Sequence, residues 1–227
     1  MNTKELYVDS VQFSYDKSRQ HITGAYLKCF TGDIVALFGR NGSGKSTLLK
    51  IIFGSLKAKN SYILLNGKKV GKTYLTRKVG YLPQDSFLPT QERVSKLVDL
   101  LIGDTHHKSL LWNDARIKAL QDKKVHQLSG GERRYLEIWL LMCQPTDFVL
   151  LDEPFTGIEP IYITMIIDLI RRFSDKKGFI ITDHNYHDLL PIASQVVLLQ
   201  NGSCQRIENK RDLEFFYLPD GTFDEWC

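Results

Sequence analysis

The sequence predicts an α/β fold built around a mixed, mainly parallel central sheet, to which an antiparallel β layer and a helical segment are added. Two observations lead to this prediction. Short continuous apolar runs, typical of strands buried on both faces of a parallel sheet, occur at residues 34–38, 148–151 and 179–182. An apolar helical stretch at 161–173 separates the last two runs, so that β and α alternate.

The length of 227 residues is enough for one large domain, or two closely packed lobes, with a substantial core. A composition of 43% hydrophobic and 25% charged residues is typical of a soluble globular protein and excludes fibrous and disordered classes. The longest uncharged stretch, 189–205, includes Pro191 and several amides, so it lacks the roughly 20 apolar residues of a membrane span. The first residues show no signal-peptide pattern. We therefore expect a cytoplasmic protein.

The charged residues and cysteines give weaker indications. The net charge is +4, and basic doublets such as Arg133-Arg134 and Lys176-Lys177 are spread along the chain. We interpret the doublets as solvated side chains on helix and turn surfaces, with a face for nucleic acid or anionic lipid as the alternative. The cysteines lack the spacing of a zinc site or a disulfide framework, and we expect reduced thiols at Cys29, Cys143, Cys204 and Cys227.

The β-rich runs come first along the chain. Residues 6–15 and 24–30 are joined by a polar loop, which predicts an antiparallel layer. Residues 34–38 then form the first central strand. Residues 62–65 begin a second antiparallel pair, because Asn66-Gly67 is a dipeptide suited to a type I′ hairpin turn.

Strand signals stop between residues 88 and 128. Val94, Leu97, Val98 and Leu101 fall on one face of a helix in this segment, which predicts a helical lobe. We expect residues 1–227 to form a single unit. Its core, including the β layer, would comprise 1–87 and 145–227, and the helical subdomain would comprise 88–144.

A glycine-rich loop follows the first central strand and precedes an apolar helix. It fits the pattern G-x-x-x-x-G-K-[ST], in which backbone N–H groups and a helix N-terminus surround phosphate oxygens. Lys45 would reach the β and γ phosphates, and the Ser46 hydroxyl would bind Mg²⁺. The sequence therefore predicts a P-loop NTPase core whose nucleotide-binding residues are Gly39, Arg40, Asn41, Gly42, Ser43, Gly44, Lys45 and Ser46.

Two acids end a later buried run, at the carboxyl edge of the sheet where ligands bind. Asp152 is the expected holder of Mg²⁺, and Glu153 is placed to polarise the water that attacks the γ-phosphate. Ser129, Gly130 and Gly131 precede an amphipathic helix. On their own, their N–H groups would serve equally as an anion site or as an ordinary helix cap.

Together these motifs resemble, in order and over essentially the whole chain, the nucleotide-binding subunit of ATP-binding cassette (ABC) transporters. The family's Walker A motif matches residues 39–47, which adds Thr47 to the expected nucleotide-binding residues, and its Q-loop matches Gln84. Its signature matches 128–132, Walker B with the catalytic glutamate matches 150–154, and the switch histidine matches His184. The resemblance implies a P-loop core with an antiparallel β subdomain and a helical signature subdomain.

The resemblance also implies an activity. The protein would be an Mg²⁺-dependent ATPase in which Glu153, His184 and Gln84 take part in catalysis. Ser46, Gln84 and Asp152 would serve the metal ion.

Further roles follow from the same resemblance. Tyr15 matches the aromatic residue that stacks on adenine. Two such chains, identical or different, would dimerise head to tail, with Ser129, Gly130 and Gly131 of one chain acting on the ATP of the other. The dimer would associate peripherally with the cytoplasmic face of a membrane and power a separate transmembrane permease subunit. No nucleic-acid partner is expected.

The permease is expected to dock in a groove beside the Q-loop, with Phe87, Leu88, Arg93 and Lys96 as lining residues. The chain departs from the family's usual D-loop, Ser-Ala-Leu-Asp, because Glu159 stands at the acid position. The C-terminal aromatic residues are expected to pack on the protein's own surface rather than to dock a partner: Phe215, Phe216, Tyr217, Phe223 and Trp226.

Other function classes fit less well. A soluble ABC-type ATPase for nucleic-acid or ribosome work would need a long insertion between Lys45 and Ser129, or a second P-loop, and the sequence shows neither. A regulatory or cofactor-assembly subunit stays open. A P-loop kinase or GTPase would lack the Ser-Gly-Gly motif and the late histidine.

Overall fold

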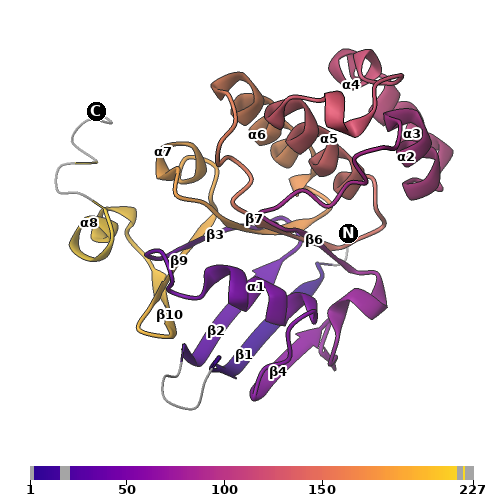
Figure 1. The fold of residues 1–227 in the computed structure, drawn as a ribbon. Helices are drawn as coiled ribbons and strands as arrows, with labels where there is room; N and C mark the ends of the chain where they lie inside the picture. The colour runs from indigo at the N-terminus through magenta and orange to yellow at the C-terminus, as the bar shows by residue number, and fades with distance from the viewer. Residues whose placement is uncertain (1–2, 16–20, 219–221, 223–227) are drawn as a thin grey trace.

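The computed structural model describes residues 3–15, 21–218 and 222, and it contains two sheets with helices between and above them (Figure 1). Within these residues the larger sheet has six strands in the order β10-β9-β3-β8-β7-β6. Every neighbouring pair is parallel except the antiparallel pair β9 and β10. The strands are β3 (Ile34–Phe38), β6 (Val79–Leu82), β7 (Phe148–Asp152), β8 (Gly178–Thr182), β9 (Gln195–Gln200) and β10 (Ser203–Ile207). The predicted mixed, mainly parallel sheet is confirmed.

The smaller sheet is antiparallel and, in the described part of the chain, has four strands in the order β2-β1-β4-β5. They are β1 (Glu5–Phe13), β2 (Ile22–Phe30), β4 (Asn60–Leu65) and β5 (Lys68–Lys69). The turn between β4 and β5 has φ of 52° at Asn66 and 74° at Gly67. Both values are left-handed, as a type I′ turn requires, so the predicted hairpin is confirmed.

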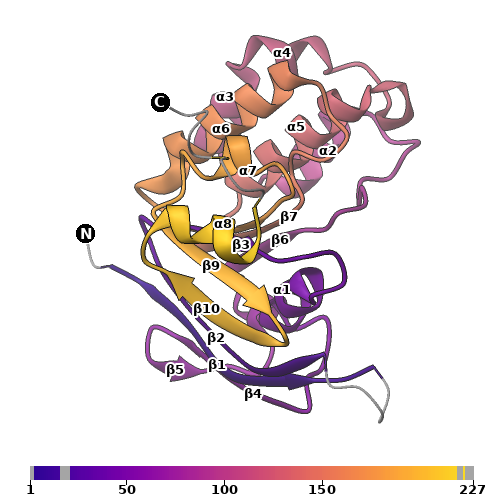
Figure 2. The same cartoon turned by 90° about the vertical axis from the view of Figure 1, so that its left-hand side faces the viewer.

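Helix α1 (Lys45–Phe53) lies between the two sheets (Figure 2). Successive residues of a strand point to opposite faces, so each central strand contributes to two cores. Leu150 of β7 packs with α1 and the smaller sheet. Its neighbour Leu151 packs with α5 (Gly130–Met142) and α6 (Pro160–Ser174) on the other face. The larger sheet is therefore a middle layer buried on both sides.

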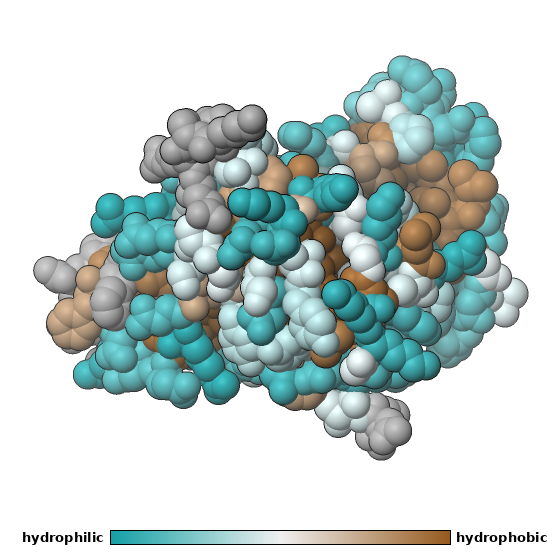
Figure 3. Space-filling view, turned by 90° about the horizontal axis from the view of Figure 1, so that it is seen from below, coloured by the Kyte–Doolittle hydropathy of each residue, from teal (hydrophilic) through white to brown (hydrophobic). Residues whose placement is uncertain are grey.

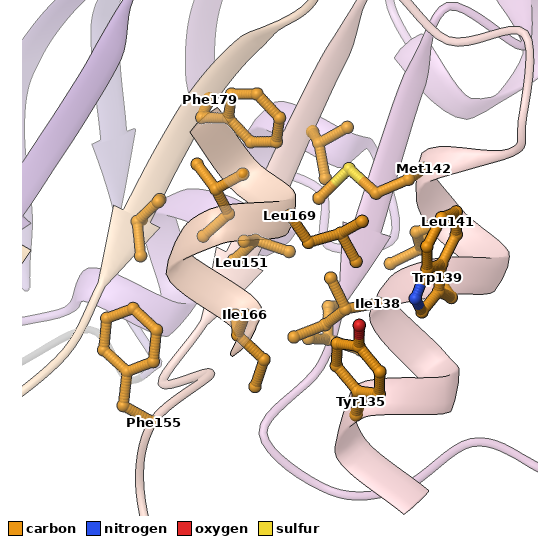
Figure 4. Close-up of a cluster of buried hydrophobic side chains, with 14 of the residues drawn as sticks. Tyr135, Ile138, Trp139, Leu141, Met142, Leu151, Phe155, Ile166, Leu169 and Phe179 are labelled. Atoms are coloured by element: carbon orange, nitrogen blue, oxygen red, sulfur yellow. The ribbon is translucent and has the colours of Figure 1, made fainter. Parts of the chain in front are cut away.

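The helices above the sheet form the predicted helical lobe: α2 (Val94–Leu101), α3 (Thr105–Trp112), α4 (Ala115–Ala119) and α5. Figure 4 shows the side chains of α5 and α6 meeting over the sheet, with Trp139 and Leu169 among them. The Trp139 ring is edge-on to Phe173, with 6.0 Å between centroids. One prediction is wrong at the end of α2, where Leu101 is 36% exposed and Ile102, just beyond the helix, is buried instead.

Short helices complete the chain: α7 (Tyr186–Leu189), α8 (Leu213–Phe216) and 3₁₀ turns at Thr73–Thr76, Val125–Gln127 and Lys210–Asp212. Among the described residues, no helix combines the length and the apolar character needed to cross a bilayer.

The C-terminal segment only partly follows its prediction. Tyr217 packs on Phe38, with 5.6 Å between ring centroids, but the expectation is wrong for Phe215, whose side chain is 83% exposed. The side chain of Phe216, and Phe223 and Trp226 altogether, lie outside the described residues. Free thiols are present at Cys29, Cys143 and Cys204, and Cys227 lies outside the described residues.

Candidate functional site

The glycine-rich loop, residues 39–44, joins β3 to α1 at the carboxyl edge of the larger sheet. Its conformation needs glycine: φ is 155° at Gly39, 77° at Gly42 and 104° at Gly44. A Cβ atom on Gly39 would stand 2.5 Å from the carbonyl oxygen of Leu199. The loop therefore folds tightly against β9 while the N-terminus of α1 faces its interior.

Lys45 begins α1 and is only 6% exposed. Its Nζ donates to the carbonyl oxygens of Gly39 at 2.7 Å and Arg40 at 3.4 Å. Burial lowers the pKa of Lys45, and the nearby carboxylates of Glu153 and Asp152 partly counteract this effect. The loop thus carries a buried ammonium group whose hydrogen bonds go to neutral carbonyls, an arrangement suited to a phosphate ligand.

Ser43 gives a second indication of a ligand in the loop. Its Oγ is buried and has no hydrogen-bond partner among the described residues. Buried polar atoms are nearly always paired in proteins. A phosphate oxygen bound in the loop fits this unpaired hydroxyl.

Asp152 ends β7 and is 1% exposed. Its Oδ1 accepts hydrogen bonds from Ser46 Oγ at 2.9 Å and from Thr182 Oγ1 at 2.8 Å. Its Oδ2 accepts from Tyr81 OH at 3.0 Å, and burial raises the pKa of that phenol. The carboxylate is therefore fixed by α1, β8 and β6 together. Sequence reasoning missed Thr182 and Tyr81, because nothing in the chain pattern marks them as neighbours of Asp152.

The residues beside Asp152 fit Mg²⁺. A hydroxyl and a carboxylate, Ser46 and Asp152, lie in contact at the mouth of the loop, and Mg²⁺ prefers oxygen ligands. Within the described residues there is no group of three or more His, Cys, Asp or Glu side chains that could hold a metal ion. Mg²⁺ does not need one at a nucleotide site, because phosphate and water oxygens supply most of its ligands.

Glu153 stands in the turn after β7 with φ of 50°, a left-handed conformation that is uncommon outside glycine. Its N–H donates to the carbonyl oxygen of Thr182 at 2.9 Å. Its Oε2 accepts from Gln84 Nε2 at 2.9 Å, and its Oε1 lies 3.0 Å from His184 Nε2. The structure therefore brings together the three predicted catalytic residues, which come from the ends of β6, β7 and β8.

Asp183, next to His184, is a further residue that sequence reasoning missed. It is 1% exposed, and its carboxylate accepts from the backbone N–H groups of Phe155 and Asn185, each at 2.8 Å. Burial raises its pKa, whereas these hydrogen bonds oppose the change. Asp183 thus ties the turn after β8 to the turn after β7, and so fixes His184 relative to Glu153.

A cavity of about 570 Å³ opens over Lys45, Glu153 and His184. Its volume lies within the range of small-molecule sites. Its lining includes Tyr15, which is 65% exposed and whose hydroxyl lies 2.9 Å from Thr47 Oγ1. The Tyr15 ring is edge-on to His21, with 5.1 Å between centroids. The full lining is Tyr15, His21, Asn41, Gly42, Gly44, Lys45, Ser46, Thr47, Gln84, Glu153 and His184.

The signature residues lie elsewhere. Ser129 caps α5, since its Oγ accepts from the N–H of Glu132 at 3.1 Å and the Glu132 carboxylate accepts from the Ser129 N–H at 2.9 Å. Gly130 lines a smaller cavity of about 130 Å³, and Gly131 packs against Tyr162 and Glu159. Within one chain, therefore, the predicted signature residues do not line the cavity at the phosphate loop.

The interpretation of the basic doublets as solvated is wrong for two members. Arg134 is 7% exposed and Lys177 is 5% exposed. Arg134 donates to the carbonyl oxygen of Gln84 at 2.9 Å and to that of Glu153 at 3.3 Å. It therefore belongs to the surroundings of the site.

Comparison with known proteins assigns the chain to a family. The sequence model described as "ABC transporter" matches residues 22–156. The chain is 33% identical to the lipopolysaccharide export system ATP-binding protein LptB of Acidithiobacillus ferridurans, over 87% of each chain. It is 30% identical to LptB of Escherichia coli K12, over 82% of this chain and 83% of that one.

Solved structures share the fold. The ATP-binding subunit of an ABC transporter superimposes with a TM-score of 0.83, over 97% of this chain and 96% of the other, at 21% identity. At that identity the likeness concerns the fold alone, and the family assignment rests on the sequence matches. The chain belongs to the ABC transporter family, as one of its ATP-binding subunits.

Proposed function

We propose that the protein hydrolyses ATP with Mg²⁺ and that Glu153 is the general base. The observation that supports this most directly is the convergence of Gln84, Glu153 and His184 over the cavity that also contains Lys45. A carboxylate beside the γ-phosphate position can accept the proton of an attacking water. Both Glu153 oxygens carry hydrogen-bond contacts here, so a water must displace or share one of them.

Each remaining group has a role in this reaction. The loop amides and Lys45 bind the phosphates, and Ser46 and Asp152, with Gln84, hold Mg²⁺. When bound, the metal ion offsets the negative charge on the phosphate oxygens. His184 orients the water together with Glu153, and it contacts the γ-phosphate.

We assign adenine stacking to Tyr15. Its ring stands at the mouth of the cavity, is largely exposed, and is fixed at its hydroxyl by Thr47. A largely exposed aromatic ring that lines a nucleotide cavity is suited to stack on a base.

We further propose that two chains close head to tail around ATP. The signature residues Ser129, Gly130 and Gly131 lie outside the cavity of their own chain, and Ser129 and Gly130 are exposed, so they can meet the ATP of a second chain, whereas Gly131 is buried behind them. The N–H of Gly130 and the positive end of the α5 dipole would then stabilise phosphate charge, while the N–H of Ser129 stays bound to Glu132.

The partner is proposed to be a separate membrane-spanning subunit, with the dimer lying peripherally on the cytoplasmic face. A further cavity, about 430 Å³, opens beside the Q-loop, and its lining includes Phe53, Tyr74, Phe87 and Leu141. Hydrophobic residues also gather on the right of the view in Figure 3, the side on which Figure 1 places α2. An apolar hollow of this kind suits a docking helix.

This hollow and the expected docking groove share Phe87 and differ in the other residues. Phe87 lines the cavity, as expected. Leu88 is buried at 5% exposure, so it is not available to a partner. Arg93 and Lys96 are exposed but do not belong to the lining, and Lys96 pairs with Glu92 at 2.7 Å.

The named relatives favour transport over the alternative, a soluble ABC-type ATPase for nucleic-acid, ribosome or cofactor-assembly work. The first-named relative is an ATP-binding protein of a lipopolysaccharide export system. We therefore retain the transporter subunit as the proposed function.

The experiment that tests the proposal compares the wild-type protein with Glu153→Gln. We expect the variant to bind ATP and to hydrolyse it at least about 100-fold more slowly, the usual scale for loss of a general base. Near-normal turnover would remove Glu153 from this role.

A second experiment tests the partner. Glu153→Gln is purified in mild detergent with Mg-ATP, and the proteins that come with it are identified by mass spectrometry. Recovery of a polytopic membrane protein supports transport, and recovery of only soluble proteins or nucleic acid supports the alternative.

A further inference from the structure

Arg134 and Glu137 lie one turn apart on α5 and form an ion pair inside the protein. Their side chains are 8% and 2% exposed, and Arg134 Nη1 is 3.3 Å from Glu137 Oε2. Buried charges are tolerated only where their remaining donors and acceptors are also paired. The other partners of the two side chains therefore indicate what the pair is for.

The guanidinium of Arg134 binds two turns of the backbone at once. Nη1 donates to the carbonyl oxygen of Pro83 at 2.8 Å, and Nη2 donates to that of Gln84 at 2.9 Å. Nη2 also reaches the carbonyl oxygens of Asp152 at 3.4 Å and Glu153 at 3.3 Å. The four carbonyl oxygens therefore belong to two adjacent pairs of residues, Pro83 with Gln84 and Asp152 with Glu153.

Glu137 holds the same Q-loop turn from its other end. Its Oε1 accepts hydrogen bonds from Ser86 Oγ at 2.5 Å and from the N–H of Phe87 at 3.2 Å. The ion pair of α5 is thus anchored to the backbone on both sides of Asp85.

The backbone at Glu153 needs such support. Its φ of 50° is a conformation that persists in a residue with a Cβ only where the surroundings hold it. Thr182 binds its N–H, with the carbonyl oxygen at 2.9 Å and Oγ1 at 3.1 Å, and Arg134 binds its carbonyl oxygen. Both anchors act on the residue proposed as the general base.

We propose that Arg134 is a positioning residue for ATP hydrolysis. Its rigid planar fork fixes the backbones of Gln84 and Glu153 at the separation that lets their side chains meet at 2.9 Å, and Glu137 fixes the fork. Arg134 touches no reacting atom, so it acts only through these residues. The inference rests on the proposed ATP hydrolysis.

This role predicts a change in kcat without a matching change in KM. Among the described residues, no hydrogen bond or ion pair joins Arg134 to the phosphate loop or to Tyr15, so ATP affinity should persist when the guanidinium is lost. Misplacement of a catalytic group by about 1 Å costs on the order of 100-fold in rate. If the ion pair served folding alone, its loss would lower the melting temperature and leave the kcat of the folded protein unchanged.

The test measures steady-state hydrolysis of Mg-ATP and thermal melting for wild type, Arg134→Lys and Ser86→Ala. Lysine keeps the charge opposite Glu137 but cannot span both turns, so we expect kcat to fall about 10- to 100-fold with KM within about twofold. Ser86 is an exposed residue, and Ser86→Ala removes only the hydrogen bond from its hydroxyl to Glu137. We expect a smaller fall in kcat, also at constant KM.

The matched control is Arg171→Lys on α6. Arg171 also pairs with an acid three residues away, Asp168, but the side chains are 57% and 69% exposed and 4.0 Å apart. Its kcat and KM should equal those of wild type.

The outcomes separate this inference from the proposed function. An inactive wild type overturns the proposed function itself. An active wild type with unchanged kcat in Arg134→Lys and Ser86→Ala overturns the positioning role alone, as does a loss that follows the unfolded fraction. If Arg134→Lys fails to fold, Ser86→Ala decides: a lower kcat at constant KM supports the role, and an unchanged kcat refutes it.

Discussion

At the scale of single residues, burial changes what a charged side chain does. Lys177 donates from Nζ to the carbonyl oxygens of Gln144 and Thr146, both at 2.7 Å, and to Thr146 Oγ1 at 3.0 Å. It therefore ties the segment after α5 to the start of β8. Burial lowers its pKa to about 8, although the carboxylate of Asp147 opposes the change.

This pKa predicts a pH-dependent stability. The ordinary pKa of the group is 10.5, so between about pH 8 and 10.5 the unfolded chain binds more protons than the folded one, and stability rises with pH. Between about pH 7.5 and 9.5 the gain amounts to at most about 2 kcal/mol. Lys177→Met has no titrating amine at this position, so its free energy of unfolding lacks this rise with pH.

Urea unfolding of wild type and Lys177→Met at both pH values checks the prediction. The free energy of unfolding of wild type, relative to the variant, should increase at the higher pH. The buried tyrosines and the other buried cysteines titrate in both proteins, so their effects cancel in the difference. Cys143, whose pKa depends on Lys177, is replaced by alanine in both proteins. Parallel pH dependence of the two proteins would contradict the assigned pKa.

At the scale of elements, the start of α5 is defined by its contact with α6. A Cβ atom on Gly131 would lie 2.2 Å from Tyr162 Cδ2 and 2.6 Å from Glu159 Oε2, whereas one on Gly130 would meet only the carbonyl oxygen of Gly157 at 3.9 Å. Glu159, the residue at the D-loop acid position, precedes α6 and packs beside the signature of its own chain.

The two glycines therefore predict opposite responses to alanine. Gly131→Ala should lower the free energy of unfolding by about 1–3 kcal/mol, the usual cost of overpacking. Gly130→Ala should be neutral or slightly stabilising, because alanine is the better helix former. Urea unfolding compares them, and since both sites gain the same helix propensity, the difference isolates the steric contact. Equal stability of the two variants would refute this account.

The packing of the helices shows whether the hydrophobic core is divided between the two proposed subdomains, 88–144 and the rest of the chain. α5 belongs to the helical part by sequence, but its buried face shares one core with β7, β8 and α6. We propose that the boundary at residue 144 is a turn of the chain rather than a break in the core.

At the scale of the whole molecule, the proposed head-to-tail dimer predicts complementation. Lys45→Ala removes the phosphate lysine, and Ser129→Arg blocks the signature; each protein alone should be inactive. In a mixed dimer one site contains both defects and the other contains neither. We expect ATPase activity to reappear on mixing, measured as phosphate release against total protein concentration. An inactive mixture of folded variants would contradict signature action in trans.

The hollow beside the Q-loop predicts where the membrane partner binds. Tyr74→Ser, which changes its lining, should reduce recovery of the membrane subunit in detergent purification. Phe215→Ser is the matched control, because Phe215 is an exposed aromatic outside the lining. Equal recovery with both variants would place the partner on another surface.

The phosphate loop and the carboxyl-edge acids could be predicted from the order of the amino acids alone. Gly39, Gly42 and Gly44 are required by a local backbone conformation, and local conformation is encoded locally. The placement of Asp152 and Glu153 followed from a second local fact, that both end a strand of a parallel sheet. The relatives and the shared fold agree with the family that these motifs predicted.

Which polar side chains are buried, around the site and elsewhere, follows from the packing of the folded chain. Arg134 and Lys177 look alike in sequence to the solvated basic residues beside them, yet both are buried with several hydrogen bonds. Thr182 and Asp183 likewise gained partners from turns distant in the chain. The physical reason is that burial depends on which segments pack together, and a pattern along one segment contains no record of its neighbours in space.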